Sequence, residues 1–331
     1  MRYLKTLSPQ AIGIAAAVIT VIIWTAFIII ARATTDPARG ATMTPLDIMV
    51  ARILGAGLVL LPWGWWLVRR DQLVGNGRAS SMFGFSPLSF RITALTGVFG
   101  GLLYGIFAYN GFVYAPAAHA SVLLPGSLPL WTTLLAVVVL HERLTRVRLA
   151  SLLLIVCGDL LVGGASLLRA FDGGVVWRGD VLFMIGAFSW SMYTVLARKF
   201  LLDAVRATIA ITVFAAMTYL PVYGVLLLTQ VVHSRFTSAP LGDILFQMFF
   251  QGCGSVVISG ITFTKMVQHF GPVRTTMFTA IVPGSSALGA VYFLGEPLTW
   301  NLWAGLALVT FGILFGVRRV VPAAAASVVS A

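Results

Sequence analysis

Charged side chains are scarce in this 331-residue chain, since Asp, Glu, Lys and Arg make up 10% of it against about 25% in soluble domains. That scarcity excludes a cytosolic enzyme, a nucleic-acid-binding protein and a disordered chain. Cysteine is also scarce, and because Cys157 and Cys253 both fall in apolar runs, no disulfide framework is expected. Hydrophobic residues supply 59% of the chain and the mean hydropathy is +0.96, which predicts a polytopic membrane protein.

Acidic residues are few as well, and of the ten Asp and Glu residues only Asp159 falls near the middle of a long apolar run. An intramembrane enzyme with paired acid–base carboxylates is therefore not expected, and the chain has no HExxH or GxSxG motif. Ion channels and metal transporters use rings or clusters of Asp, Glu or His, which this sequence does not provide. No catalytic residue and no metal site are predicted.

Long apolar runs dominate the chain instead. A helix needs roughly 20 apolar residues to cross about 30 Å of hydrocarbon. We expect ten transmembrane helices, at 11–31, 46–68, 92–114, 117–140, 148–168, 179–198, 206–230, 243–266, 272–294 and 300–317. The runs lack the two-residue alternation of membrane strands, so the predicted fold class is an all-α membrane protein. The first run is longer than a signal-peptide core, which favours a retained helix.

Basic residues are distributed unevenly between alternate connections. Fifteen lie on the side of the N-terminus and five on the other, while Arg52 and Lys265 fall within spans, which accounts for all 22. Because cytoplasmic loops collect Lys and Arg, we expect both termini in the cytoplasm. The net charge of +12 then reflects topology and not a nucleic-acid surface.

Motifs of the first half recur in the second half in the same order. Three matched pairs carry this duplication: Trp24-(x)7-Arg32 with Trp190-(x)7-Arg198, Pro129-(x)12-Glu142 with Pro283-(x)12-Glu296, and Leu61-Pro62 with Leu220-Pro221. Each unit has five spans, an odd number, so the second copy is expected upside-down relative to the first. Inverted repeats that meet around a central site are a recurrent transporter architecture. We predict repeats at residues 11–168 and 178–318.

With Trp in the middle of the first span and Pro-(x)12-Glu-x-Leu-Thr at the end of the fourth, the chain resembles the EamA branch of the drug/metabolite transporter superfamily. Within that branch it looks most similar to bacterial aromatic amino acid exporters. The resemblance implies ten helices around a central cavity, with the fifth and tenth at the periphery. It also implies export of a small molecule across the bacterial inner membrane without a cofactor. The oligomeric state stays open, a monomer included.

Aromatic side chains near mid-membrane are the first candidates for a substrate site. Most of the nine tryptophans lie at the membrane surfaces, where they form belts, but three lie too deep for that. Three tyrosines add a ring face and a hydroxyl each, with Tyr109 the best placed. Cavity lining is predicted for all six, with helix packing as the alternative: Trp24, Trp131, Trp190, Tyr104, Tyr109 and Tyr193. An aromatic cavity suits an apolar or aromatic substrate.

Ionisable residues within a membrane are costly and by default suggest function. Arg52 is a candidate for holding a substrate carboxylate, the alternative being a structural bond to backbone carbonyls. His119 is a candidate for a proton or substrate role, and Lys265 for cavity contact unless it extends to the surface. Asp159 is either a proton carrier or a protonated or hydrogen-bonded structural residue, and its equivalent in the second half is Ile313.

Prolines interrupt the fourth span of each repeat. A proline removes a backbone donor and kinks a helix. The affected residues are Pro125, Pro129, Pro283 and Gly284. They are predicted to flex and open one face of the cavity, with a simple kink as the alternative.

The sequence therefore predicts an exporter of amino acids and related metabolites, preferring aromatic or bulky apolar ones, that works by alternating access. The alternative is a proton-coupled multidrug or other metabolite exporter of the same superfamily. Small multidrug members carry a glutamate in their first helix, whereas this chain has no carboxylate between residues 11 and 31. That departure disfavours a cation antiporter and leaves the energy coupling open.

Overall fold

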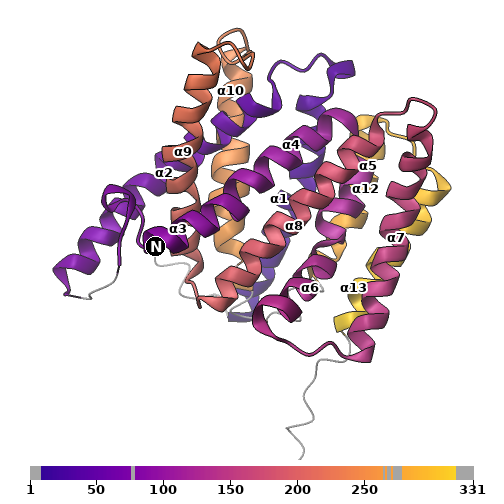
Figure 1. Ribbon diagram of the computed structural model, residues 1–331, viewed down its shortest axis with the longest axis horizontal. Coiled ribbons are helices and arrows are strands. Elements are labelled where there is room, and N and C mark those ends of the chain that lie inside the picture. The colour runs from indigo at the N-terminus through magenta and orange to yellow at the C-terminus, as the bar shows by residue number, and fades with distance from the viewer. Residues whose placement is uncertain (1–8, 76–78, 264, 267–269, 271–277, 318–331) are drawn as a thin grey trace, which may run out of the picture.

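In the computed structural model, residues 9–75, 79–263, 265, 266, 270 and 278–317 are described, and helices run along most of this length (Figure 1). The α-helices are α1 (Pro9–Thr35), α2 (Pro45–Leu73), α3 (Phe90–Thr96), α4 (Tyr104–Tyr114), α5 (Ala117–Ser121), α6 (Leu128–Leu140), α7 (Arg146–Ala170), α8 (Val176–Lys199), α9 (Ala204–Leu228), α10 (Leu241–Gln247), α12 (Ile281–Leu294) and α13 (Trp300–Val317). Wider π-helical segments are η4 (Gly97–Leu103), η5 (Val122–Gly126) and η6 (Met248–Ile258), and short 3-10 turns are η2 (Pro37–Arg39) and η3 (Met82–Gly84).

Among the described residues, eight helices are long and apolar enough to cross a membrane. They coincide with the first eight predicted runs to within a few residues: Ala11–Thr35, Pro45–Leu73, Phe90–Tyr114, Ala117–Leu140, Arg146–Ala170, Val176–Lys199, Ala204–Leu228 and Leu241–Phe263. Two shorter apolar helices, Ile281–Leu294 and Trp300–Gly316, overlap the ninth and tenth runs. Residues 272–277 of the predicted ninth span lie outside the described residues. The chain is thus an all-helical multi-span protein, while the count of ten and the inverted arrangement stay predictions.

Side-chain caps fix where several helices begin. Thr44 and Asp47 form a reciprocal capping box at the start of α2, with Pro45 in its first turn, where a missing N–H is harmless. Thr145 accepts from the Arg148 N–H and Asp203 from the Arg206 N–H, which begins α7 and α9 in the same way.

The fourth predicted span is broken as the prolines indicate. It consists of α5, η5 with Pro125 inside it, and α6, which starts with Pro129 in its first turn. Because proline cannot donate its backbone nitrogen, the wider η5 segment absorbs the interruption. Pro283 lies in the first turn of α12, and a Cβ added at Gly284 would meet open space.

Glycines set the closest helix contacts. A Cβ at Gly55 of α2 would lie 1.9 Å from the carbonyl oxygen of Met248, so only glycine lets α2 and η6 approach this closely. Gly158 of α7 and Gly305 of α13 meet in the same manner, and Ser151 donates to the Gly312 carbonyl at 2.6 Å. Figure 1 shows α7 and α13 side by side at one edge of the molecule, where the family resemblance places the fifth and tenth spans.

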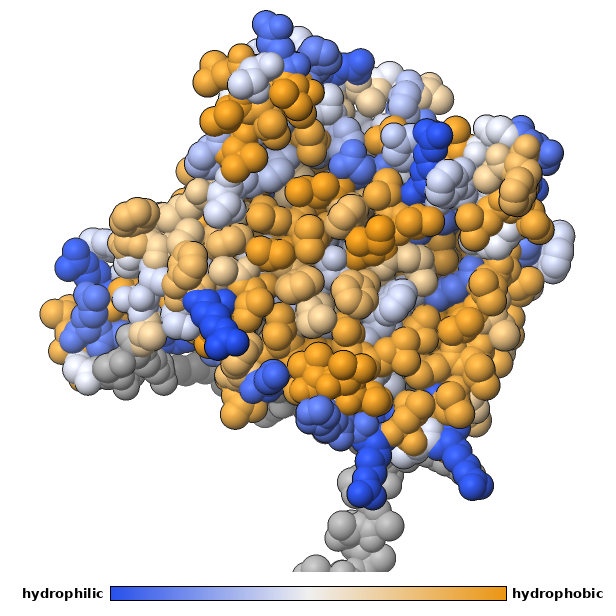
Figure 2. All heavy atoms as spheres, viewed as in Figure 1, coloured by the Kyte–Doolittle hydropathy of each residue, from blue (hydrophilic) through white to orange (hydrophobic). Residues whose placement is uncertain are grey.

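On the face seen in Figure 2, apolar side chains cover the middle and polar ones gather toward the two ends. Near the end of α2 and at the start of α8, tryptophan rings lie beside guanidinium groups: the Arg69 guanidinium carbon is 5.4 Å from the Trp65 ring centre, Arg70 is 5.5 Å from Trp66, and Arg178 is 5.9 Å from Trp177. Such pairs suit the interface between hydrocarbon and water.

Candidate functional site

Arg52 lies at the centre of a polar cluster that joins three helices. Its Nη1 donates to the Ser255 hydroxyl at 3.2 Å and to the Tyr109 hydroxyl at 3.4 Å, and Tyr109 donates to Oε1 of Gln251 at 2.8 Å. Its partners are therefore side-chain hydroxyls and not the backbone carbonyls of the structural alternative. Among the described residues Arg52 has no carboxylate within ion-pair distance.

A continuous series of aromatic rings extends from this cluster. Phe27 contacts Tyr109 edge to face with ring centres 5.8 Å apart, and Tyr104 lies 6.5 Å from Phe27. Trp190 follows at 4.9 Å from Tyr104, and Tyr193 at 5.2 Å from Trp190. The structure thus brings four of the predicted aromatic residues into one row that ends at a guanidinium.

Trp24 approaches the same region from α1. Its indole N–H donates to the Ser259 hydroxyl at 3.3 Å, and its ring stacks on Phe263 with centres 5.4 Å apart. The neighbouring Thr25 hydroxyl bonds to that of Ser285 in α12 at 2.6 Å. Trp24 therefore contacts the residue one turn beyond Ser255, the partner of Arg52 on this helix.

Three residues of this cluster were not predicted from the sequence: Gln251, Ser255 and Ser259. They recur at every fourth position of an apolar span, which is the signal that could have found them. In a regular α-helix of 3.6 residues per turn, such a row drifts around the helix. The i→i+5 bonding of η6 widens the turn and reduces that drift, so the polar side chains stay on one side.

Other predicted site residues lie elsewhere. Trp131 packs edge to face on Phe188 at 5.4 Å, and its N–H has no partner among the described residues. The side chain of Lys265 is exposed. Nδ1 of His119 lies 2.9 Å from Asp180, whose other carboxylate oxygen accepts from Ser166.

Asp159 is nearly fully buried in α7, one residue from the Gly158 contact with α13. Neither of its carboxylate oxygens has a hydrogen-bond partner in the part of the chain that the structure describes. The hydrogen-bonded alternative therefore gains no support. A protonated structural residue and a proton carrier both remain open.

Two ion-pair clusters join residues of the duplicated motifs. Arg32 pairs with Glu296 at 3.4 Å and with Asp36 at 3.0 Å, and Glu296 also accepts the backbone N–H groups of Ala117 and Ala118, which begin α5. This cluster is almost entirely enclosed.

The second cluster is more open to solvent. Arg198 pairs with Glu142 at 2.5 Å and Arg148 with Glu142 at 3.2 Å. Partial burial raises the pKa of the Glu142 carboxyl. The hydrogen bonds and positive charges of Arg198 and Arg148 together outweigh that effect and hold this pKa below its usual value.

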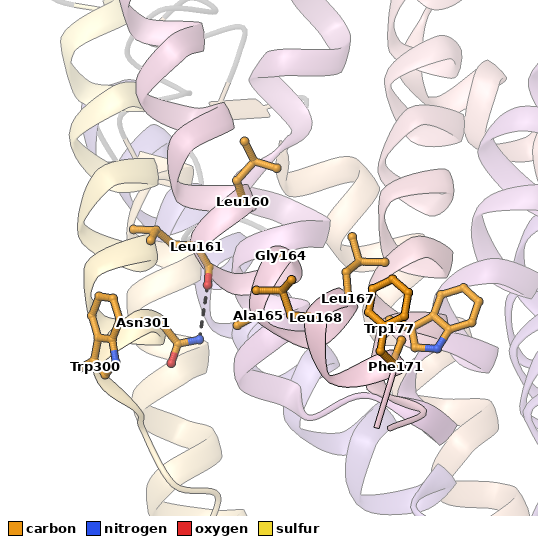
Figure 3. A pocket seen from close by; sticks show the side chains of 11 residues that line it. Leu160, Leu161, Gly164, Ala165, Leu167, Leu168, Phe171, Trp177, Trp300 and Asn301 are labelled. Atoms are coloured by element: carbon orange, nitrogen blue, oxygen red, sulfur yellow. Dashed lines mark hydrogen bonds between the residues drawn. The ribbon is translucent and has the colours of Figure 1, made fainter. Parts of the chain in front are cut away.

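Two hollows lie outside the Arg52 cluster. The larger, about 710 Å³, is an apolar groove between α7, the start of α8 and the start of α13 (Figure 3). Few of the atoms that line this groove are polar, and the side-chain amide of Asn301 already donates to the Leu161 carbonyl. Few polar groups converge there, which makes it a poor site for a polar substrate. The smaller hollow, about 210 Å³, lies between the end of α1, the following loop and α10.

Comparison with known proteins identifies the family to which this chain is related. The sequence profile of the EamA-like transporter family matches residues 11–164 and 177–318, nearly the whole chain. One solved crystal structure aligns over 94% of this chain and 98% of its own with a TM-score of 0.55 and 20% sequence identity, which indicates a shared fold.

Several curated relatives are transporters. An uncharacterized transporter of Bacillus subtilis, YyaM, is 25% identical over 70% of this chain and 75% of its own length. An uncharacterized transporter of Clostridium kluyveri is 22% identical over 83% and 84%. A probable amino-acid metabolite efflux pump of Salmonella typhimurium is 25% identical over 61% and 69%.

These findings indicate a transporter and not an enzyme, and a multi-span protein of this bacterial family fits the inner membrane. They also match the superfamily that the Trp and Pro–Glu motifs indicate in the sequence. The chain belongs to the EamA-like transporter family of the drug/metabolite transporter superfamily.

Proposed function

We propose that this protein exports amino acids, preferring aromatic or bulky apolar ones, across the bacterial inner membrane by alternating access. The observation that carries the proposal is the Arg52 guanidinium, which has no carboxylate partner among the described residues and lies at one end of a row of aromatic rings. A charge within a membrane is costly unless it is paired, so a ligand that pairs with it is favoured.

The cluster offers complementary groups to both parts of an aromatic amino acid. The substrate carboxylate would accept from the Arg52 guanidinium, the residue type whose planar fork best matches a carboxylate. Its side chain would lie against the rings of Tyr104 and Trp190, which form the far part of the row. This lining would be extended by Trp24 and Tyr193. A conformational change would be needed to bring Trp131, His119 and Lys265 to the site.

The architecture we propose is ten spans in two inverted repeats, residues 11–168 and 178–318, with both termini cytoplasmic. The ion pairs support this architecture. In each of them, the Arg of the Trp–Arg motif in one half pairs with the Glu of the Pro–Glu motif in the other half. Arg32 of the first unit pairs with Glu296 of the second, and Arg198 of the second pairs with Glu142 of the first. A pseudo-two-fold relation between the halves accounts for this exchange.

Tyr109 and Gln251, which form the Arg52 cluster with it, are buried, so a substrate reaches the cluster when helices separate. The interrupted fourth span and its counterpart are the elements we propose to flex, at Pro125, Pro129, Pro283 and Gly284. A π-helical segment holds its backbone bonds less regularly than an α-helix, which suits a hinge.

The test is uptake of labelled phenylalanine, tryptophan and threonine into liposomes that contain the purified protein, with and without a pH gradient. We expect gradient-free uptake of phenylalanine and tryptophan that falls at least tenfold in Trp190→Ala and Tyr109→Ala. Trp303→Ala is the matched control, because this tryptophan is about half exposed on α13. Uptake of no amino acid under either condition would refute the proposal.

The alternative, a proton-coupled multidrug or metabolite exporter, is favoured by the buried Asp159, whose carboxylate oxygens have no hydrogen-bond partner among the described residues. The same liposomes distinguish it when Asp159→Asn is included. Loss of the gradient-dependent part of transport in this variant, with gradient-free uptake intact, would assign proton coupling to Asp159. Lipophilic cations moving in place of amino acids would favour the alternative as a whole.

A further inference from the structure

The polar row on η6 continues beyond the Arg52 cluster. Asp243 and Gln247 of α10 precede Gln251, Ser255 and Ser259 at the same spacing, so a polar side chain occurs at every fourth position from 243 to 259. Residues four apart on a helix are neighbours on its surface. One helix face thus joins the Arg52 cluster to Asp243.

Gln247 is the unexplained member of this row. It has no exposed surface, and neither its amide nitrogen nor its amide oxygen has a hydrogen-bond partner among the described residues. Burying an unpaired amide is destabilising, because the hydrogen bonds it made to water are lost without replacement. A purely structural role favours Leu or Met at such a position.

Gln247 forms part of the wall of the 210 Å³ hollow. The other polar contributors are Thr34 at the end of α1, Arg39 and Thr42 in the loop, and Asp243 one turn away on α10. A water molecule takes up about 30 Å³ in the liquid, so the hollow has room for a small polar group together with its hydration.

The charges around the hollow favour a cation. Arg39 donates to the Leu294 carbonyl and lies 3.4 Å from Asp36, so its charge is balanced. Asp243 accepts only a neutral bond, from the Thr42 hydroxyl at 2.8 Å, and has no basic partner in the described part of the chain. Arg235 donates to the Ala41 carbonyl at 2.8 Å at the rim of the hollow, with its side chain exposed to solvent. Asp243 is thus the ionised side chain in the wall that lacks an ion pair among the described residues.

We propose that this hollow is a second substrate subsite, in which Asp243 and Gln247 bind the ammonium group of the amino acid. The subsite rests on the proposed function and adds to it a second recognition site, which binds the ammonium group after the substrate carboxylate has left Arg52. An ammonium group has three donors and no acceptor. The Asp243 carboxylate and the Gln247 carbonyl supply acceptors that the described residues leave free.

The row also supplies a path between the two subsites. Gln251 and Gln247 are fully buried and lie one turn apart on this row, so a substrate that leaves Arg52 would pass Gln251 and reach Gln247 once the helices separate. With the predicted orientation, this end of α10 faces the outside, so the subsite lies on the exit side.

The test compares four proteins in liposomes: wild type, Gln247→Met, Asp243→Asn and the matched control Gln72→Met, whose glutamine is exposed at the end of α2. Uptake of labelled phenylalanine gives KM, and phenethylamine, which has the ammonium but no carboxylate, serves as inhibitor. The thermal midpoint of each purified protein gives its stability. We expect Gln247→Met and Asp243→Asn each to raise KM about tenfold and to weaken phenethylamine inhibition by a similar factor, since one lost charged hydrogen bond is worth about a factor of ten.

Stability distinguishes binding from structure. Since Met has a similar shape and no unpaired amide, we expect the midpoint of Gln247→Met to equal or exceed that of wild type. A lower midpoint, an unchanged KM in both variants, or no inhibition of wild type by phenethylamine would each overturn the subsite. If wild type moves no amino acid at all, the proposed function itself fails; if wild type moves phenylalanine and both variants match it, only the subsite fails.

Discussion

Replacing Glu296 by Ala should destabilise the protein far more than the same change at its motif equivalent, Glu142. The Glu296 side chain is 10% exposed and that of its partner Arg32 is 14% exposed. Its two carboxylate oxygens accept the N–H groups of Ala117 at 3.0 Å and Ala118 at 3.1 Å, which are the first donors of α5. One carboxylate therefore neutralises a buried cation and caps a helix.

The structure sets the magnitude of the loss. Breaking a buried ion pair costs about 3–5 kcal/mol, because the remaining charge stays buried. Arg32 keeps Asp36 at 3.0 Å and the Phe112 carbonyl at 2.5 Å, so we expect the lower end, about 3 kcal/mol. Glu142 is 28% exposed and its partner Arg198 54% exposed, and exposed pairs contribute only about 0–1 kcal/mol.

The assay is thermal unfolding of the two purified variants and wild type in one detergent, with denaturation followed by the accessibility of Cys253, which is partly buried in the folded protein, to a fluorescent thiol reagent. The midpoint should fall about three times as far in Glu296→Ala as in Glu142→Ala. Glu296→Gln should recover part of the loss, because an amide oxygen still caps α5 while the charge is gone. Equal decreases in the two alanine variants would refute the reasoning from burial.

Three further predictions concern separate parts of the structure. Arg52→Gln should raise the KM for phenylalanine at least about tenfold, because a charged hydrogen bond to the carboxylate is lost; inhibition by phenethylamine should not change, and an equal effect on both ligands would contradict a carboxylate site. Gly55→Ala should cost about 3 kcal/mol in unfolding experiments or prevent folding, because its Cβ would meet the Met248 backbone, whereas Gly224→Ala, with open space around it, should be tolerated. Glu142→Gln should have a lower thermal midpoint than wild type at neutral pH. The pKa of Glu142 is lowered in the folded state, so its stabilisation is complete above the ordinary value of 4.5 and is lost as the pH falls through the lowered folded-state pKa. A difference between the two midpoints that persists well below pH 4.5 would contradict this.

Much of the architecture follows from the sequence. Backbone groups in hydrocarbon must bond within their own segment, so a long apolar run has little choice but a helix, and eight predicted runs coincide with helices of sufficient length. The prolines predict the break in the fourth span, which the structure shows at η5. The duplicated Trp and Pro–Glu motifs also lead to the family that the sequence profile identifies.

The composition of the site depends on the tertiary structure. Arg52 meets residues 57 and 203 positions away, and the wider turns of η6 help to keep Gln251 and Ser255 on one side of their helix. His119 looks like a free ionisable group in the sequence, yet in the structure it pairs with Asp180.

The physical reason for this division lies in the solvent. In a water-soluble protein, the apolar stripe of a helix shows in the sequence which side is buried. In a membrane, the lipid-facing side of a helix is as apolar as the side that packs on other helices, so the sequence does not distinguish the two sides. The sequence by itself thus determined where helices form, how the motifs repeat and which family the chain resembles. Helix rotation and the close approach at Gly55 decided which polar groups meet, because those depend on packing between segments far apart in the chain.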